Sequence, residues 1–254
     1  MRVLDCNACR TDILPAAGET ATVWKPERNR VLRALCPSDQ NKVFPSLKVI
    51  ELRKGEFLYE NGPESHFMYF PIDAVLTLRH ILLDGHGCDL ARVGWEGMIG
   101  LVLFRETIST PYCIQVQFGG HALRLKSGLM LTVAEKSMPF RSLLLSCFHA
   151  VMMQIAQSVA CNRHHTIQQQ FCRYMLDALD HGTGDVVKST HDQIASSLGV
   201  RREGVTEAAI RLQKQRLIQY HRGHIKVIDR GGMESRSCEC YAVVKRQIRE
   251  LLPR

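Results

Sequence analysis

The sequence predicts an α+β protein with three parts: an N-terminal, jelly-roll-like β-roll of the kind used as a sensor domain, a long dimerisation helix, and a C-terminal winged helix-turn-helix. Short apolar runs separated by turn residues predict the strands of the roll. An uncharged stretch with helical periodicity predicts the long helix. Helix-turn-helix spacing between His191 and Ile210, followed by alternating residues, predicts the third part.

The length and composition of the chain are those of a folded, basic protein. Its 254 residues exceed what one small domain needs, so we expect two domains. An apolar content of 45% suffices for packed cores, and a net charge of +8 favours an anionic partner. Residues 1–20 contain no long apolar run and the ten cysteines are scattered, so we expect a cytoplasmic protein with reduced thiols.

The N-terminal part divides into a tail and a roll. Residues 1–27 are polar and lack periodicity, so we expect a flexible tail there. Residues 28–136 form the expected roll, which begins with helical turns between residues 27 and 47. Over residues 48–126, short apolar runs alternate with turns such as Asn61-Gly62-Pro63, which is typical of a β-sandwich or β-roll.

A long helix is predicted over residues 137–162. Ser137 followed by Pro139 is a typical helix start. No Lys, Arg, Asp or Glu stands between Arg141 and Arg163, a stretch long enough to cross a bilayer. The polar side chains within it would lack partners in lipid, so we expect no membrane insertion.

The apolar side chains of this helix cover more than one of its faces. Such a helix can cover its own roll and also pair with a second copy of the chain, whereas a monomer would use it only as a core helix. We favour the homodimer. The expected dimerisation residues are Phe140, Leu144, Phe148, Val151, Met152, Ile155 and Val159.

The C-terminal domain is predicted over residues 163–254, and it contains the helix-turn-helix. Gly199 occupies the turn, where a positive φ angle costs glycine least. Thr190 and Gln193 have the spacing of a capping box, which leaves N–H groups of the first helix free to bind a phosphate. Arg222-Gly223 forms the tight turn of a wing.

Basic side chains follow the second helix of this motif. Residues 188–230 contain nine Lys or Arg and four Asp or Glu, so most of the net positive charge lies in this segment. An Arg in the major groove can bond guanine with both arms, and a Glu can accept from cytosine. An ordinary helical hairpin with solvated charge is the alternative. The expected DNA-binding residues are Thr190, Gln193, Arg201, Arg202, Glu203, Thr206, Glu207, Arg211, Lys214 and Arg222.

The order of roll, long helix and winged helix-turn-helix resembles the Crp/Fnr family of dimeric bacterial regulators. The stretch LGVRREGVTEAAIRLQKQRLIQYHRGHIKVIDR resembles the DNA-binding signature of that family, in which Arg202 and Glu203 match the base-reading pair. Glu207 stands where well-studied members have another Arg, so the usual half-site is not expected. The resemblance implies a homodimer on palindromic promoter sites of double-stranded DNA, with RNA polymerase as a further partner. The segments CNRHHTIQQQFCRY and SCECYAVVKRQIRELL resemble a subgroup with an additional C-terminal helix.

The effector does not follow from the sequence. By the same resemblance, a cyclic-nucleotide pocket needs a Glu for the ribose and an Arg for the phosphate. Leu101 stands at the first position and Thr110 falls at the second, so cyclic AMP is not expected, because its phosphate would be buried without a counter-charge. The residues assigned to an effector pocket are Glu96, Leu101, Thr110 and Tyr112.

The cysteines leave a metal or redox function open. Cys6-x-x-Cys9 has ligand-like spacing and, with Cys36 and either Cys88 or Cys113, resembles the iron–sulfur set of a redox-sensing Crp/Fnr member. Cys238-x-Cys240 is a second close pair.

The residues around the predicted domain boundary at residue 163 suggest two further possibilities. His164-His165 is a possible metal or haem ligand pair, although we expect these side chains to face solvent or to cap helices. An enzyme that uses Cys161 as nucleophile is the remote alternative, since no third orienting group or catalytic motif accompanies it.

Overall fold

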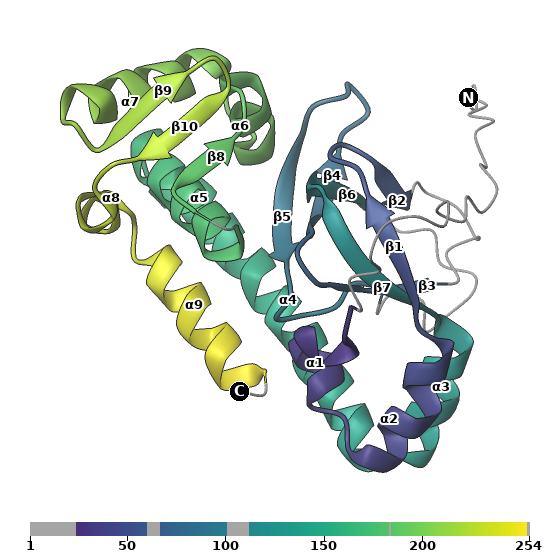
Figure 1. Ribbon diagram of the computed structural model, residues 1–254. Helices are drawn as coiled ribbons and strands as arrows, with labels where there is room; N and C mark the ends of the chain where they lie inside the picture. The colour runs from purple at the N-terminus through teal and green to yellow at the C-terminus, as the bar shows by residue number, and fades with distance from the viewer. Residues whose placement is uncertain (1–23, 60–66, 101–111, 183, 253–254) are drawn as a thin grey trace.

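The computed structural model describes residues 24–59, 67–100, 112–182 and 184–252 (Figure 1). A roll of two antiparallel sheets is followed by the long helix α4 (Met138–His164), which leads into a helix-turn-helix domain with a three-stranded sheet. The last helix, α9 (Cys240–Leu251), returns beside α4 (Figure 1). This architecture confirms the predicted α+β fold class.

The roll begins with two short α-helices and two 3-10 turns that Asn29 anchors. Its amide donates to the carbonyl groups of Pro71 (3.0 Å) and Gly97 (2.9 Å), while its Oδ1 caps the first helix by accepting from Val31 N. Asn29 is completely buried, so these bonds are shielded from water. The elements are η1 (Pro26–Arg28), α1 (Arg30–Arg33), α2 (Pro37–Val43) and η2 (Phe44–Ser46).

The predicted tail is too long at its C-terminal end. Residues 1–23 lie outside the described part of the chain, but Trp24 packs against the core of the roll. Its ring stacks on His121 with 4.5 Å between centroids, and the guanidinium of Arg28 lies 5.0 Å from its centroid. These contacts fix residues 24–27, contrary to the expectation of a flexible segment.

Two sheets form the roll, as the alternation of apolar runs and turns predicts. The first has the order β1-β7-β3, and the second has the order β2-β6-β4-β5. The first sheet contributes buried side chains to two apolar clusters. One cluster packs on α1, α3 and α4, and the other, which the second sheet completes, lies between the sheets. The strands are β1 (Lys48–Leu52), β2 (Phe57–Tyr59), β3 (Phe67–Pro71), β4 (Val75–Ile81), β5 (Gly87–Val93), β6 (Tyr112–Phe118) and β7 (Gly120–Lys126).

Helix α4 begins at the predicted cap and ends two residues beyond the predicted range of 137–162. The Ser137 hydroxyl caps it by accepting from Phe140 N, and the helix ends at His164. The preceding helix α3 (Ser127–Lys136) was not predicted. By length and composition α4 is able to span a membrane. Its Gln154, however, accepts a hydrogen bond from Arg92 N of the roll, so this face is committed to a protein contact.

The faces of α4 differ from the prediction in one respect. Phe140 and Leu144 are 1% and 3% exposed and belong to the core of the roll, so their assignment to a dimer surface is corrected. Val151 and Ile155 pack against the second cluster of the roll. Helical spacing put Val151 and Ile155 on the predicted dimer surface, but in the structure this part of α4 covers the chain's own roll. The expected residues that remain well exposed are Phe148, Met152 and Val159.

The C-terminal domain has one apolar core formed by its helices and its small sheet. The sheet has the order β8-β10-β9, and the turn Arg222-Gly223 joins the two strands of the predicted wing. The elements are α5 (Ile167–His181), β8 (Val186–Lys188), α6 (His191–Leu198), α7 (Arg202–Lys214), β9 (Ile218–His221), β10 (His224–Val227) and α8 (Arg230–Arg236).

Helix α9 links the two halves of the chain. Its start belongs to the C-terminal domain, while Leu252, just beyond its end, is buried in the core of the roll. The carbonyl group of Leu252 accepts from the Arg30 guanidinium at 3.1 Å. The chain end therefore packs on the roll rather than only on the domain to which the sequence assigned it.

We predict that Asn29→Ala destabilises the protein. The substitution removes the cap of α1 and leaves two buried carbonyl groups without a donor, so the free energy of unfolding should fall by roughly 3 kcal/mol. Urea denaturation measures it. The control is Asn41→Ala on the exposed side of α2, which should change stability by less than about 0.5 kcal/mol. Equal effects of the two substitutions would contradict the anchoring role.

Candidate nucleic-acid interface

The first helix of the motif, α6, is fixed at both ends as the sequence predicts. Thr190 and Gln193 form a capping box, in which the threonine hydroxyl accepts from Gln193 N and the glutamine side chain accepts from Thr190 N. Gly199 ends the helix with φ of +67°, a left-handed conformation that a side chain would strain. The turn between α6 and α7 is therefore set by local sequence.

Helix α7 packs tightly on the rest of the domain because its inner face is small and apolar. Val205, Ala208, Ala209 and Leu212 are buried. A Cβ at Gly204 would lie 2.5 Å from Cδ1 of Ile167 on α5, so glycine permits this close approach. Sequence reasoning did not single out Gly204, since its partner lies far away in the chain.

The opposite face of α7 carries the predicted DNA-binding side chains. Those at its start and along its outer side are exposed, and so are the cap residues of α6 and the wing turn. Thr206 is half-buried, because its hydroxyl lies 3.0 Å from Nδ1 of His191. The exposed members of the predicted set are Thr190, Gln193, Arg201, Arg202, Glu203, Glu207, Arg211, Lys214 and Arg222.

Two acidic residues have basic partners on this surface. Arg202 lies 3.5 Å from the Asp192 carboxylate, and Arg211 lies 3.3 Å from the Glu207 carboxylate one helical turn away. All four side chains are more than 60% exposed, so these ion pairs contribute little to stability. The two arginines can exchange these partners for phosphate or base atoms at small cost.

The roll contacts the helix-turn-helix directly. Nζ of Lys54 donates to Oε1 of Gln193 at 3.1 Å and to the Lys188 carbonyl group at 2.6 Å. Arg79 of β4 donates to the Ser196 carbonyl group at 3.1 Å while it pairs with Asp89 at 2.9 Å. The roll thus holds α6 through hydrogen bonds to Gln193 on its first turn and to Ser196 on its second turn.

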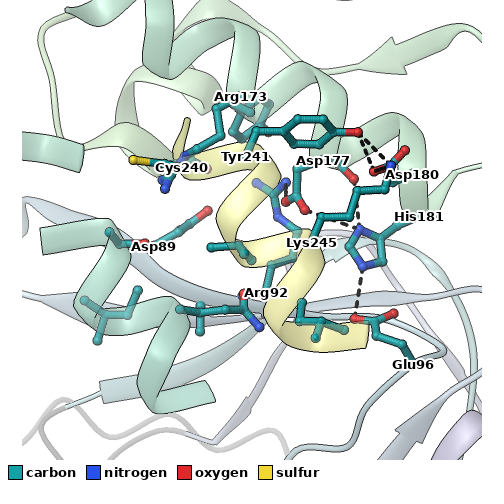
Figure 2. A pocket seen from close by; sticks show the side chains of 18 of the residues that line it. Asp89, Arg92, Glu96, Arg173, Asp177, Asp180, His181, Cys240, Tyr241 and Lys245 are labelled. Atoms are coloured by element: carbon teal, nitrogen blue, oxygen red, sulfur yellow. Dashed lines mark hydrogen bonds and ion pairs between the residues drawn. The ribbon is translucent and has the colours of Figure 1, made fainter. Parts of the chain in front are cut away.

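A cavity of about 370 Å³ lies between the roll, α4, α5, α6 and α9 (Figure 2). Its walls are charged: Arg92 pairs with Asp177, and Asp180 accepts from Tyr241 (2.7 Å) and pairs with Lys245 (2.8 Å). The cavity therefore lies where the two domains and the last helix meet.

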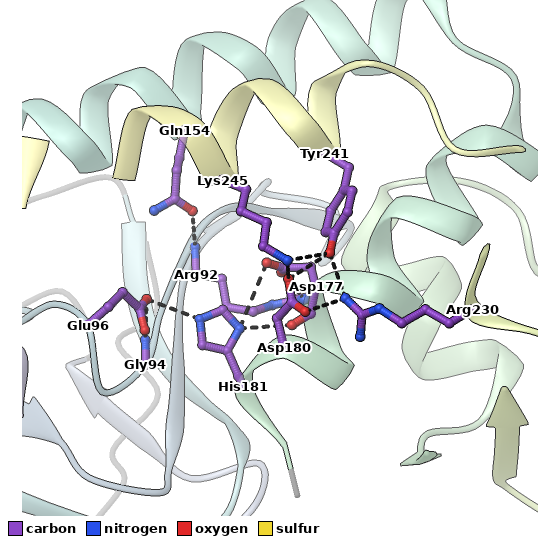
Figure 3. Close-up of polar contacts among 10 residues, drawn as sticks. All are labelled: Arg92, Gly94, Glu96, Gln154, Asp177, Asp180, His181, Arg230, Tyr241 and Lys245. Atoms are coloured by element: carbon purple, nitrogen blue, oxygen red, sulfur yellow. Dashed lines mark hydrogen bonds and ion pairs between the residues drawn. The ribbon is translucent and has the colours of Figure 1, made fainter. Parts of the chain in front are cut away.

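Glu96 of the roll and His181 of α5 form a buried ion pair between the domains (Figure 3). Nε2 of His181 lies 3.0 Å from the Glu96 carboxylate, and Nδ1 lies 2.9 Å from the Asp177 carbonyl group. Both partners are acceptors, so both ring nitrogens carry protons. Burial opposes this charge, but the Glu96 carboxylate outweighs it and raises the pKa of His181 to about 10.

The residues assigned to an effector pocket do not come together in the described part of the chain. Glu96 is engaged with His181 at the domain boundary. Tyr112 is half-buried at the start of β6. Leu101 and Thr110 lie outside the described residues.

The cysteines considered for an iron–sulfur site are equally dispersed where the structure describes them. Cys36 bonds Ser38 and Asp39 between α1 and α2, while Cys88 and Cys113 lie on β5 and β6. Cys6 and Cys9 lie outside the described residues.

A different set of ligand groups is brought together instead. Cys161, His165, Cys238 and Cys240 form one compact group. The sequence showed the pair Cys238-x-Cys240, but nothing in it indicated that the end of α4 lies against this pair. His165 was expected to face solvent or cap a helix, and it does provide the C-cap of α4, but its ring is directed to the thiols.

Comparison with known proteins assigns the C-terminal domain. Residues 169–236 match the family described as the Crp-like helix-turn-helix domain. A comparison with curated protein sequences gives no significant match.

Solved structures share the fold of most of the chain. A transcriptional regulator assigned to the Crp/Fnr family from Eubacterium rectale is similar with a TM-score of 0.68 at 15% identity, over 83% of this chain and 98% of that one. FixK2 from Bradyrhizobium japonicum has a TM-score of 0.65 at 14% identity, over 76% and 98%. The c-di-GMP-responsive regulator CLP from Xanthomonas campestris has a TM-score of 0.61 at 12% identity, over 76% and 99%.

We predict that the link between the domains weakens at alkaline pH. The raised pKa of His181 means that its charge stabilises the folded state fully below about pH 6.5, and that this stabilisation is lost as the pH rises through about 10. The thermal midpoint of the wild type should fall more steeply between these pH values than that of His181→Gln.

The control for this measurement is His86→Gln in the exposed turn between β4 and β5, which should follow the wild type. Parallel pH profiles of the wild type and His181→Gln would show that the Glu96 contact carries no such linkage.

Proposed function

We propose that this chain, which has the fold of Crp/Fnr regulators and a Crp-like helix-turn-helix domain, is a transcription regulator rather than an enzyme, and that it binds palindromic promoter DNA as a homodimer. The observation that carries the proposal is the exposed basic start of α7, where the side chains of Arg201, Arg202 and Glu203 all face solvent.

In the proposed complex, the start of α7 enters the major groove. Arg202 and Glu203 lie on its first turn and reach base edges, where the arginine reads guanine and the glutamate accepts from cytosine. Arg211 and Lys214 lie further along the helix and contact the backbone. Free N–H groups at the start of α6 and Arg222 of the wing add phosphate contacts on either side.

The proposed dimer forms along α4. One face of this helix is apolar and exposed, with Leu145, Phe148, Met152 and Val159 between 46% and 64% exposed. These residues follow one another at helical spacing, so they form a continuous exposed stripe beside the side that covers the roll. A second copy related by a two-fold axis would bury both stripes and would present its α7 helix to one half of a palindrome while the first copy binds the other half.

We infer that an effector changes DNA binding through the contacts between the roll and the helix-turn-helix. A ligand changes DNA affinity only if it prefers one arrangement of the two domains. The pair Glu96–His181 and the bonds of Lys54 and Arg79 to the C-terminal domain are the contacts that such a ligand must strengthen or break. We do not expect cyclic AMP to be that ligand.

We further propose that the protein is cytoplasmic and that its DNA-bound form contacts RNA polymerase.

We predict that two arginines of α7 have different roles. Arg202→Ala should reduce the difference between specific and random DNA binding by roughly 1–3 kcal/mol, because it removes a base contact. Arg211→Ala should weaken binding to both kinds of DNA equally, because it removes a phosphate contact. Fluorescence anisotropy with a selected site and a scrambled duplex measures both. An unchanged ratio for Arg202→Ala would refute this docking of α7.

We predict that Phe148→Glu dissociates the homodimer, because it places a charge at the centre of the apolar stripe of α4. Sedimentation velocity at micromolar concentration should show a wild-type dimer and a mutant monomer, and the mutant should lose affinity for palindromic sites. Leu83→Glu is the control, since it places the same charge on a fully exposed apolar side chain in a turn of the roll, away from α4. A monomeric wild type in the presence of DNA would exclude the proposed assembly.

A further inference from the structure

Four metal-ligand side chains meet where α4 ends and α9 begins. Cys161 and His165 lie one helical turn apart at the end of α4, while Cys238 and Cys240 flank the start of α9. Their ligand atoms all lie within 4.8 Å of one another. In the described part of the chain this is the one group of three or more His, Cys, Asp or Glu side chains so placed.

The surroundings of the three thiols differ from those of ordinary core cysteines. Cys161, Cys238 and Cys240 are at most 4% exposed, and they form a small cluster of their own, separate from the large apolar cores. By contrast, the buried thiols of Cys147 and Cys172 lie among aliphatic and aromatic side chains. A core that needed only small apolar side chains would not place a histidine ring among three sulfur atoms.

The distances fit a single tetrahedral ion. Sγ of Cys161 lies 3.6 Å from Sγ of Cys238, and Sγ of Cys240 lies 3.4 Å from Nδ1 of His165. Zinc bonds of about 2.3 Å to sulfur and about 2.0 Å to nitrogen would separate tetrahedral ligands by roughly 3.5–3.8 Å. A disulfide requires a sulfur separation of about 2.05 Å, so Cys161 and Cys238 are not joined.

The surrounding groups are those that support metal ligands. Nε2 of His165, the ring nitrogen that does not face the thiols, lies 3.2 Å from the Glu239 carboxylate. A carboxylate in this place fixes the ring and its tautomer, as is usual for histidines that bind metals. Nε2 of Gln157 donates to Sγ of Cys240 at 3.0 Å, which would stabilise the negative charge of a thiolate.

We propose that Cys161, His165, Cys238 and Cys240 bind one Zn²⁺ ion. Three sulfur ligands and one imidazole are a set that zinc favours, and four protein ligands leave no open position, so the site is structural. Binding releases the thiol protons, and the ion joins the end of the dimerisation helix to the start of the last helix. Helix α9 is thereby held on α4, where it contributes Tyr241 and Lys245 to the domain boundary.

The test is metal analysis of the full-length protein, purified without chelators. Elemental analysis should find zinc in proportion to protein. After removal of zinc under reducing conditions, titration with Co²⁺ should produce the visible bands of tetrahedral, thiolate-bound cobalt, which Zn²⁺ then abolishes. A wild-type protein that contains no zinc and shows no such bands would overturn the proposal, and this result does not depend on any variant.

Variants assign the ligands. Cys240→Ser should lose most of its zinc, whereas His165→Cys should retain it, because four thiolates also bind zinc. Gln157→Ala should lower zinc affinity about ten-fold. Cys172→Ser is the matched control, since it alters a completely buried thiol of α5 outside the group and should keep the full metal content. Equal loss of zinc from Cys172→Ser and Cys240→Ser would contradict the assignment, as would a Cys161–Cys238 disulfide in the purified protein.

Discussion

The structure depends on one constraint, which is that a long uncharged helix must be covered. Between Arg141 and Arg163, helix α4 carries no Lys, Arg, Asp or Glu, so its many apolar side chains gain free energy when other parts of the molecule cover them. The roll covers one side through Phe140 and Leu144, and α9 packs along another. The remaining stripe around Phe148 and Met152 stays exposed in the single chain, and the proposed homodimer would cover it.

The last helix extends this constraint to the whole molecule. Because α9 starts beside the end of α4 and finishes in the core of the roll, it touches both parts that flank the domain boundary. Tyr241 and Lys245 bind Asp180, so α9 also fixes α5 of the C-terminal domain. A helix of this amphipathic character gains its position from tertiary contacts rather than from its own propensity.

Sequence reasoning succeeded where a structural feature is encoded locally. Ser137, the capping box of Thr190 and Gln193, and Gly199 with its positive φ each mark a boundary that neighbouring residues set. It failed where contacts join distant segments. The ordered position of Trp24 depends on His121, the faces of α4 depend on which side meets the roll, and the thiols of α4 and α9 meet only in the folded chain. Periodicity identifies an apolar face but does not identify its partner.

In the proposed dimer, paired α4 helices hold two copies of α7 so that each reads one half of a DNA site. Selection of binding sites from random duplex DNA with the full-length protein tests it most directly. For the proposed dimer we expect enrichment of inverted repeats whose half-sites are centred about one helical turn of DNA apart. Enrichment of a single unrepeated element, or of no sequence over the starting pool, would contradict it.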